Sequence, residues 1–419
     1  MVLAYSGEQQ YKLIFFQQKI SNKMSYDRQD STLTTSTWTR CASALSSFSV
    51  GHKIPVRQIP VIKGDINYMS TDDSDYSEYD NMETNNEENI KQLRLLIEDI
   101  QISVKVLETN YESDEITESL EFIYSLFYDY SSKDNPIFAH TLVEENYCTQ
   151  AQKLLTYYVK TGIFSNPNIK RSTQFIMYTL WNFSGISDKF RLCLAQKFPL
   201  SCLFDFLQPS FTPTMNSNND QAILKNLKQA AISIIHNISL LSTAEIYFKH
   251  MVNYVEQLDV FMTHTDNKRM KLTALLCLIH LYLSKLKNEN VDFSLQYKNV
   301  FKLLFQTLKE CVKEQKVMIT TGLSAWLITY ALNKIIHLSL IATKIIDEHA
   351  IYSLMVLLKR GVIDEKFESG IVLLNLIHQQ PIKTIQILKR DKACWKLFEH
   401  MRPYLDDENN TRQNKLAAE

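Results

Sequence analysis

Four histidines recur through the middle of the chain at intervals of 14 to 16 residues: His236, His250, His264 and His280. Imidazole is a common zinc ligand, so such a recurrence is one pattern that a metal site would give. The surrounding apolar pattern, however, assigns these residues to different helices, with His264 near a turn. We therefore expect no metal site and no other cofactor.

The cysteines are the next residues that could do chemistry, and there are seven of them, none in a C-x-x-C arrangement. Cys193 and Cys202 lie nine residues apart on what we expect to be adjacent helices, which favours two core thiols over a redox centre. Scattered, buried and reduced thiols are typical of a reducing compartment. We expect the protein in the cytoplasm, with the nucleus as a second location.

Motifs of common enzymes are absent from the sequence. It contains no G-x-x-x-x-G-K-[ST], G-x-G-x-x-G, G-x-S-x-G or H-E-x-x-H segment. We therefore expect no enzymatic activity. The alternative is a regulatory subunit or an enzyme with a cryptic site inside a helical stack, which an enclosed cavity with convergent ionisable groups would favour.

The composition indicates which elements must position these residues. The chain has 419 residues, of which only 8 are glycine and 9 proline, while 45% are hydrophobic. Rossmann, P-loop, barrel and sandwich folds need glycine at turns and phosphate loops, so they are disfavoured. The sequence predicts an all-α protein.

Three segments are expected along the chain. Residues 1–88 are rich in Ser and Thr and then acidic, with eight acidic and no basic residues in 72–88, which predicts disorder. Residues 89–405 form a succession of amphipathic helical segments separated by short polar turns. Residues 406–419 are polar and are expected to fray.

The apolar segment 323–346 raises the question of a membrane span. Asn333, Lys334, His337 and Lys344 interrupt it, and a lysine inside a membrane is costly. We expect a buried helix followed by another element of the helical stack, and no membrane span.

The strongest pattern is an internal repeat. Aligning the helical segments on Leu180–Gly185 (LWNFSG) gives a series of equivalent positions at Ser125, Asn182, Asn237, His280, Tyr330 and Asn375. Two of the five intervals are lengthened by the polar loops 165–171 and 208–220. Without these loops the spacing approaches the roughly 40–47 residues of armadillo and HEAT repeats.

At these residues the chain resembles the armadillo-repeat family. The third helix of such a repeat typically ends with an aromatic residue, an Asn four residues later, an apolar residue and Ser; Tyr178–Gly185 (YTLWNFSG) fits this pattern. The resemblance covers residues 90–405 and about six units, but the glycine pairs usual before the last helix are lacking. It implies a right-handed α-α superhelix, with the choice between armadillo and HEAT stacking left open.

The resemblance also implies a function, namely a scaffold or adaptor that binds a partner polypeptide along a concave groove. In the family, Asn side chains bind the backbone of an extended peptide and aromatic residues pack its side chains. The expected groove residues are Tyr178, Asn182, Ser233, Asn237, His280, Trp326, Tyr330 and Asn375. Their alternative role is packing within or between repeats, which we also expect for Trp181 and Phe183.

Charge adds a second hypothesis about partners. The formal net charge is −1, so no nucleic acid is expected. RNA binding by helical repeats is a further alternative, disfavoured because the polar positions recur irregularly. The basic clusters are solvated faces or receive an acidic partner, for which the chain's own segment 72–88 is one candidate; they comprise Lys309, Lys313, Lys316, Lys389, Arg390 and Lys392.

Overall fold

In the computed structural model, every regular element among the described residues is a helix. The described residues are 79–418, except 131–133, 216, 249–252, 282–296 and 315–322. They divide into two compact units, one holding α2 to α12 and the other α15 to α21. The prediction of an all-α protein is confirmed for the described part of the chain.

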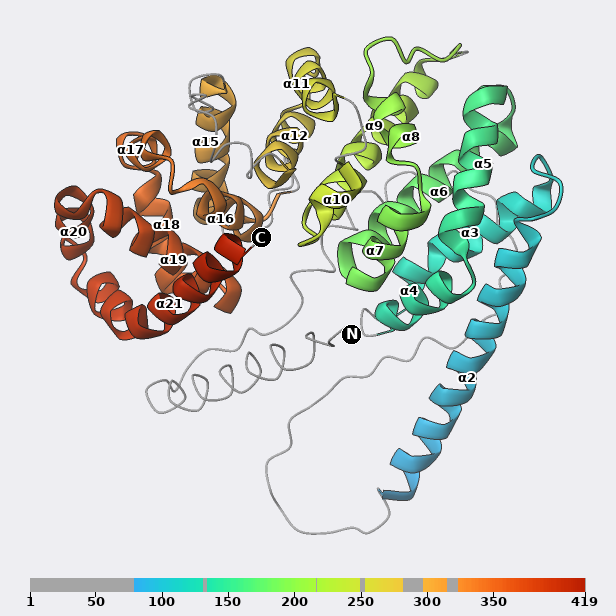
Figure 1. Ribbon diagram of the computed structural model, residues 1–419. Helices are drawn as coiled ribbons and strands as arrows, with labels where there is room; N and C mark the ends of the chain where they lie inside the picture. Colours follow the sequence, from blue (N-terminus) through green and yellow to red (C-terminus); the bar gives the residue numbers. More distant parts are fainter. Residues whose placement is uncertain are drawn as a thin grey trace. The chain divides into compact units, whose positions relative to one another are not determined.

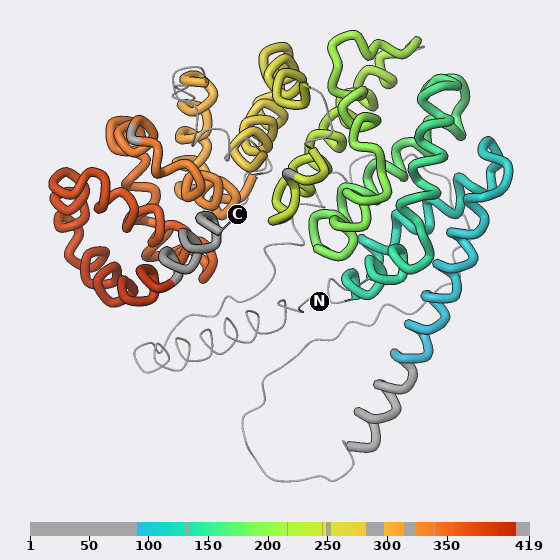
Figure 2. The backbone as a smooth tube through the Cα atoms, viewed as in Figure 1, coloured from blue at the N-terminus to red at the C-terminus, as the bar shows by residue number. Residues whose placement is uncertain are grey.

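In the first unit, α2 (Tyr79–Val106) and α3 (Asp114–Asp129) precede three helical triplets. Each triplet has a short first helix, a second helix and a longer third helix (Figures 1 and 2). The triplets are α4 (Asn135–Glu144), α5 (Tyr147–Thr161) and α6 (Pro167–Ile186); α7 (Asp188–Lys197), α8 (Leu200–Leu207) and α9 (Asn218–Ser239); and α10 (Ala244–Phe248), α11 (Tyr254–His264) and α12 (Lys268–Leu281).

Equivalent helices of successive triplets pack against one another in this unit. The third helices form one row, in which α6 contacts α3 and α9, and α9 contacts α12. The first helices form a second row through α4, α7 and α10, and α8 contacts α11. Each triplet therefore buries its apolar faces partly against its neighbours, as repeat proteins do.

The second unit contains α15 (Lys298–Glu314) and α16 (Ala325–Ile335), followed by another triplet and two further helices. The triplet is α17 (Ser339–Asp347), α18 (Ala350–Arg360) and α19 (Ile363–Gln379), and the last helices are α20 (Pro381–Lys389) and α21 (Lys392–Ala418). The apolar segment 323–346 is thus divided between α16 and α17, as predicted. None of the helices in the described ranges is long and apolar enough to cross a membrane.

Local sequence signals explain where α3, α16 and the third helices of the first unit begin. A side-chain oxygen just before each of α3, α6, α9, α12 and α16 accepts a hydrogen bond from a backbone N–H of the first turn, which otherwise has no partner. The capping residues are Ser113, Asn166, Ser217, Asn267 and Ser324.

A second recurrent signal lies between the first and second helices. Asn146, Asn253 and His349 have φ of 60°, 64° and 58°, and each occupies this junction in its own triplet. The left-handed region tolerates Asn, Asp and His better than other non-glycine residues. Three of the four described triplets therefore make the same turn, and the second uses Pro199 before α8 instead.

Helix α2 extends from Tyr79 and helix α21 extends to Ala418. Among the α2 residues from Ile90 onward, the first buried side chain is that of Ile100, and the helix packs against α3 and α4.

Candidate functional site

The row of third helices in the first unit carries a cluster of half-buried aromatic side chains, here called the aromatic patch. Its members are Tyr124 and Tyr128 of α3 and Phe175 and Tyr178 of α6. The ring of Tyr124 lies 5.1 Å from that of Tyr128, 5.5 Å from Phe175 and 6.0 Å from Tyr178. Spacings of three and four residues place each pair on one face of its helix.

A cationic side chain lies beside this patch, and burial raises the pKa of two of its phenols. The guanidinium of Arg171 lies 5.8 Å from the Phe175 ring, within the range of a cation–π contact. Burial raises the pKa of Tyr178 and, together with its neighbour Tyr128, that of Tyr124. Both phenols therefore stay protonated at neutral pH, and the patch offers neutral hydroxyl groups.

The asparagines of the repeat pattern link neighbouring third helices. Asn182 Nδ2 donates to the Tyr128 hydroxyl at 3.0 Å, which joins α6 to α3. Asn237 Nδ2 donates to Ser184 Oγ at 2.9 Å and to the Trp181 carbonyl at 3.3 Å, which joins α9 to α6. These amides act in packing between repeats, one of the two roles expected for them.

Trp181 and Phe183 flank Asn182 and differ in exposure. Phe183 is fully buried, as expected, whereas Trp181 is half-buried. The guanidinium of Arg269, from α12, lies 5.1 Å from the Trp181 ring. The surface near Asn182 is therefore more aromatic than the sequence pattern predicted.

Two predicted groove residues of α9 and α12, Ser233 and His280, differ in burial. Ser233 is buried, and its hydroxyl accepts a hydrogen bond from Gln229 at 3.0 Å, so it contributes to packing and not to an exposed surface. His280 is half-buried, with its ring 5.7 Å from that of buried His236. Burial, reinforced by the charge of Arg191, lowers the pKa of His236 to about 4.

In the second unit, α16 and α19 carry a similar combination of aromatic side chains, a nearby cation and an interhelical amide bond. Trp326 and Tyr330 stack at 5.4 Å with an interplanar angle of 14°, and Lys334 Nζ lies 5.1 Å from the Tyr330 ring. Asn375 Nδ2 donates to Asn333 Oδ1 at 3.3 Å. Here too an amide predicted for the groove joins neighbouring helices.

The predicted basic surface is exposed wherever it is described. Lys309 and Lys313 are exposed on α15, and Lys389, Arg390 and Lys392 are exposed at the junction of α20 and α21. Lys316 lies outside the described residues, as do the side chains of residues 72–88, so an intramolecular contact between them stays a prediction.

A pocket that the sequence pattern did not indicate lies in the first unit, between the loop after α8 and the facing ends of α9, α11 and α12. It has a volume of about 610 Å³, and Leu207, Phe261 and Met270 contribute apolar walls. Lys225 and Lys228 also line it, and burial lowers the pKa of Lys228. Pro209 and Met215, from the polar segment 208–220 noted in the sequence, also line this pocket.

The histidines and cysteines form no metal-binding group in the described ranges, where no cluster of three or more His, Cys, Asp or Glu side chains is found. His250 lies outside those ranges. The six described cysteines are all free thiols. Comparison of the chain with protein-family models and with curated protein sequences gave no match.

Proposed function

We propose that this chain is an armadillo-like helical-repeat protein that binds an extended segment of a partner polypeptide on its row of third helices. The observation that carries the proposal is the aromatic patch, in which the centroids of three half-buried rings lie 5.1, 5.5 and 6.0 Å from that of the half-buried Tyr124 ring. Aromatic side chains supply large contact area at low entropic cost and dominate many protein interfaces.

The triplet organisation supports the same proposal. Recurrent caps, recurrent left-handed junctions and row-by-row packing of third helices are the features expected of a stack of repeats. We also propose that the helices of the chain form a superhelix. The protein would act as a scaffold or adaptor, without enzymatic activity.

The interhelical amides give the patch a fixed geometry. Because Asn182 holds the Tyr128 hydroxyl, the α3 and α6 rings are pre-positioned before any partner arrives. Pre-organisation reduces the entropy lost on binding and so raises affinity. The partner surface best suited to this patch is apolar or aromatic side chains on an extended backbone, whose carbonyl groups can accept from the neutral phenols.

The test is selection of peptides from a random display library against the full chain, followed by fluorescence anisotropy with the selected peptides. Tyr178→Ala should weaken binding by roughly fivefold or more, since truncating an aromatic hot spot of an interface costs more than about 1 kcal/mol. The matched control is Tyr247→Ala, which truncates a half-buried tyrosine on α10, outside the aromatic patch of α3 and α6.

Circular dichroism of both variants shows whether they remain folded. Equal losses for Tyr178→Ala and Tyr247→Ala, or peptides that bind Tyr178→Ala as tightly as the unaltered chain, would refute the proposed site.

A further inference from the structure

One face of α9 lines the pocket of the first unit. Gln221, Leu224, Lys225 and Lys228 contribute to it, and intervals of three and four residues place them on the same side of the helix. The volume of about 610 Å³ lies within the roughly 300–1,000 Å³ of small-molecule sites. The pocket is therefore large enough for a small organic ligand.

Apolar side chains form much of the remaining wall. Leu207 is the last residue of α8, Met215 lies in the segment that follows, and Phe261 and Met270 come from α11 and α12. Leu207, Phe261 and Met270 are buried, and Met215 is half-buried. This wall suits the apolar part of a ligand, because contact with it removes apolar surface from water.

The polar groups at the turn between α11 and α12 already have partners within the protein. Asn267 Oδ1 accepts a hydrogen bond from the Met270 N–H at 3.2 Å, and Thr265 Oγ1 accepts one from the Asn267 N–H at 3.3 Å. His264 Nδ1 lies 2.8 Å from the Val260 carbonyl oxygen. These contacts hold the turn, so its polar groups are less available to a ligand.

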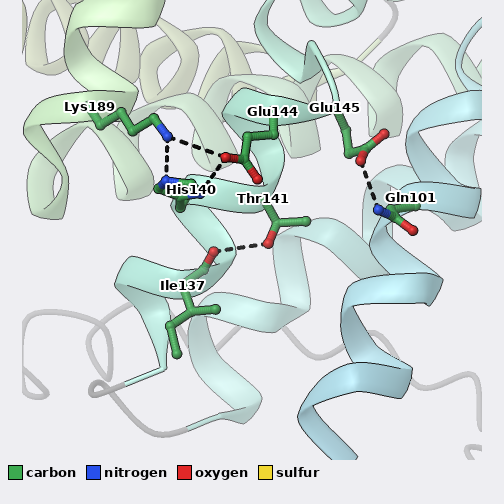
Figure 3. Close-up of polar contacts among 7 residues, drawn as sticks. All are labelled: Gln101, Ile137, His140, Thr141, Glu144, Glu145 and Lys189. Atoms are coloured by element: carbon green, nitrogen blue, oxygen red, sulfur yellow. Dashed lines mark hydrogen bonds and ion pairs between the residues drawn. The ribbon is translucent and has the colours of Figure 1, made fainter.

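The two lysines of the pocket have no such partners. Elsewhere in the unit, Lys189 Nζ lies 3.5 Å from Glu144 Oε1, which joins α7 to α4 (Figure 3). The side chains of Lys225 and Lys228, in contrast, make no hydrogen bond or ion pair with any other residue that the structure describes. Both ammonium groups are therefore available to an anion.

Burial makes one of these lysines the better candidate to contact a ligand. Lys228 is half-buried, whereas Lys225 is exposed. Burial lowers the pKa of Lys228, and an anion bound beside it would stabilise its charged form. Asp266 is the one acidic residue among the described residues of the lining, and it is exposed. Two lysines and one aspartate give the lining a formal charge of +1, with His264 counted as neutral, which suits a ligand with one negative charge.

We propose that this pocket binds an aliphatic carboxylate, with its chain against the apolar wall and its head group beside Lys228 and Lys225. A carboxylate accepts charge-assisted hydrogen bonds from ammonium groups, and these are stronger than hydrogen bonds between neutral groups. A neutral amphiphile lacks this contact, and a short acid lacks the contact of the chain. Both parts of the ligand are therefore needed.

The pocket is separate from the surface proposed to bind a polypeptide. None of the residues that line it belongs to the aromatic patch of α3 and α6. Ligand binding here is independent of the proposed function, and either proposal can fail without the other.

The first test is isothermal titration calorimetry of the full chain with octanoate, 1-octanol and acetate. Octanoate should bind at one saturable site, and octanol should bind roughly tenfold or more weakly, because it lacks the charged head group. Acetate should show no saturable binding. Hydrogen exchange measured with octanoate should show slower exchange of amides in residues 221–228 and 261–270.

Variants test the head-group contact. Lys228→Met removes the cation and should weaken octanoate binding by roughly tenfold while leaving octanol binding unchanged. The matched control is Lys271→Met, which changes a half-buried lysine on α12 that does not line the pocket and should leave the octanoate affinity unchanged. Circular dichroism checks that both variants are folded. If Lys228→Met does not fold, Lys225→Met takes its place and should weaken octanoate binding by roughly threefold, since Lys225 is exposed.

Four results would overturn the proposal. They are equal affinities for octanoate and octanol, saturable binding of acetate as tight as that of octanoate, an equal loss of octanoate affinity in Lys228→Met and Lys271→Met, and protection from exchange only outside residues 207–270.

Discussion

Replacing His236 with Phe should increase the free energy of unfolding, relative to that of the unaltered chain, by an amount that grows as the pH falls. His236 lies on α9 with 5% of its surface exposed, and its Nε2 atom is buried with no hydrogen-bond partner among the described residues. Burial lowers its pKa from 6.5 to about 4. Above about pH 7.5 both the folded and unfolded chains hold a neutral imidazole, so this group adds almost no pH dependence there.

The sign of the change in the free energy of unfolding depends on which state, folded or unfolded, binds the proton at the higher pH. As the pH falls below 6.5, the unfolded chain protonates His236 while the folded chain keeps it neutral, so the free energy of unfolding decreases. The loss grows by up to about 1.4 kcal/mol per pH unit, reaching about 1.4 kcal/mol near pH 5.5 and about 2.5 kcal/mol near pH 4.5. It levels off below the folded-state pKa of about 4.

The assay is urea unfolding of the unaltered chain and of His236→Phe at several pH values, with hydrogen exchange of α9 amides to assign the transition to the first unit. Other groups titrate in both proteins, so the difference between the two isolates His236. The variant should gain about 2.5 kcal/mol relative to the unaltered chain between pH 7.5 and pH 4.5. The control is His264→Gln, which changes an exposed histidine and should follow the unaltered chain. A difference that does not change with pH would refute the reasoning.

Three further predictions concern stability and can be read by chemical denaturation. Asn237→Ala removes two hydrogen bonds to α6 and should cost about 1–3 kcal/mol; an unchanged midpoint would show that the amide does not join the helices. Gly361→Ala would place a Cβ atom 2.6 Å from a backbone carbonyl oxygen and should cost about 1–3 kcal/mol, whereas Gly185→Ala, whose Cβ would meet its nearest neighbour at 3.6 Å, should stabilise α6 by about 0.5–1 kcal/mol. Equal effects of the two glycine variants would contradict the packing. Lys170→Met removes the cation 3.2 Å from the carboxylate of Asp220, which is 2% exposed, and should destabilise the chain more than Lys225→Met, which changes an exposed lysine on α9.

The helical class of the chain could be predicted from local signals. Scarce glycine and proline, apolar residues at helical spacing, and capping residues such as Ser217 and Asn166 act within a few neighbouring residues, so the sequence displays them directly. The division of 323–346 into two helices was predicted for the same reason, since polar residues interrupt the apolar segment. The repeat pattern also marked the third helices, because Asn182, Asn237 and Asn375 recur at equivalent positions.

The amino-acid sequence could not determine what those asparagines contact, because their partners lie on other helices. Asn237 bonds to residues 53 and 56 positions away, and Asn182 to one 54 positions away, so only the packing of α3, α6 and α9 decides the pairs. Packing likewise buries Ser233.

The same holds for the thiols. Packing buries Cys148, Cys277, Cys311 and Cys394 and leaves Cys193 and Cys202 half-buried. The sequence by itself determined the helices and their repetition, because hydrogen bonding and periodicity within a helix are local. Tertiary structure alone decided which polar and aromatic groups meet, because those contacts depend on how helices distant in sequence pack.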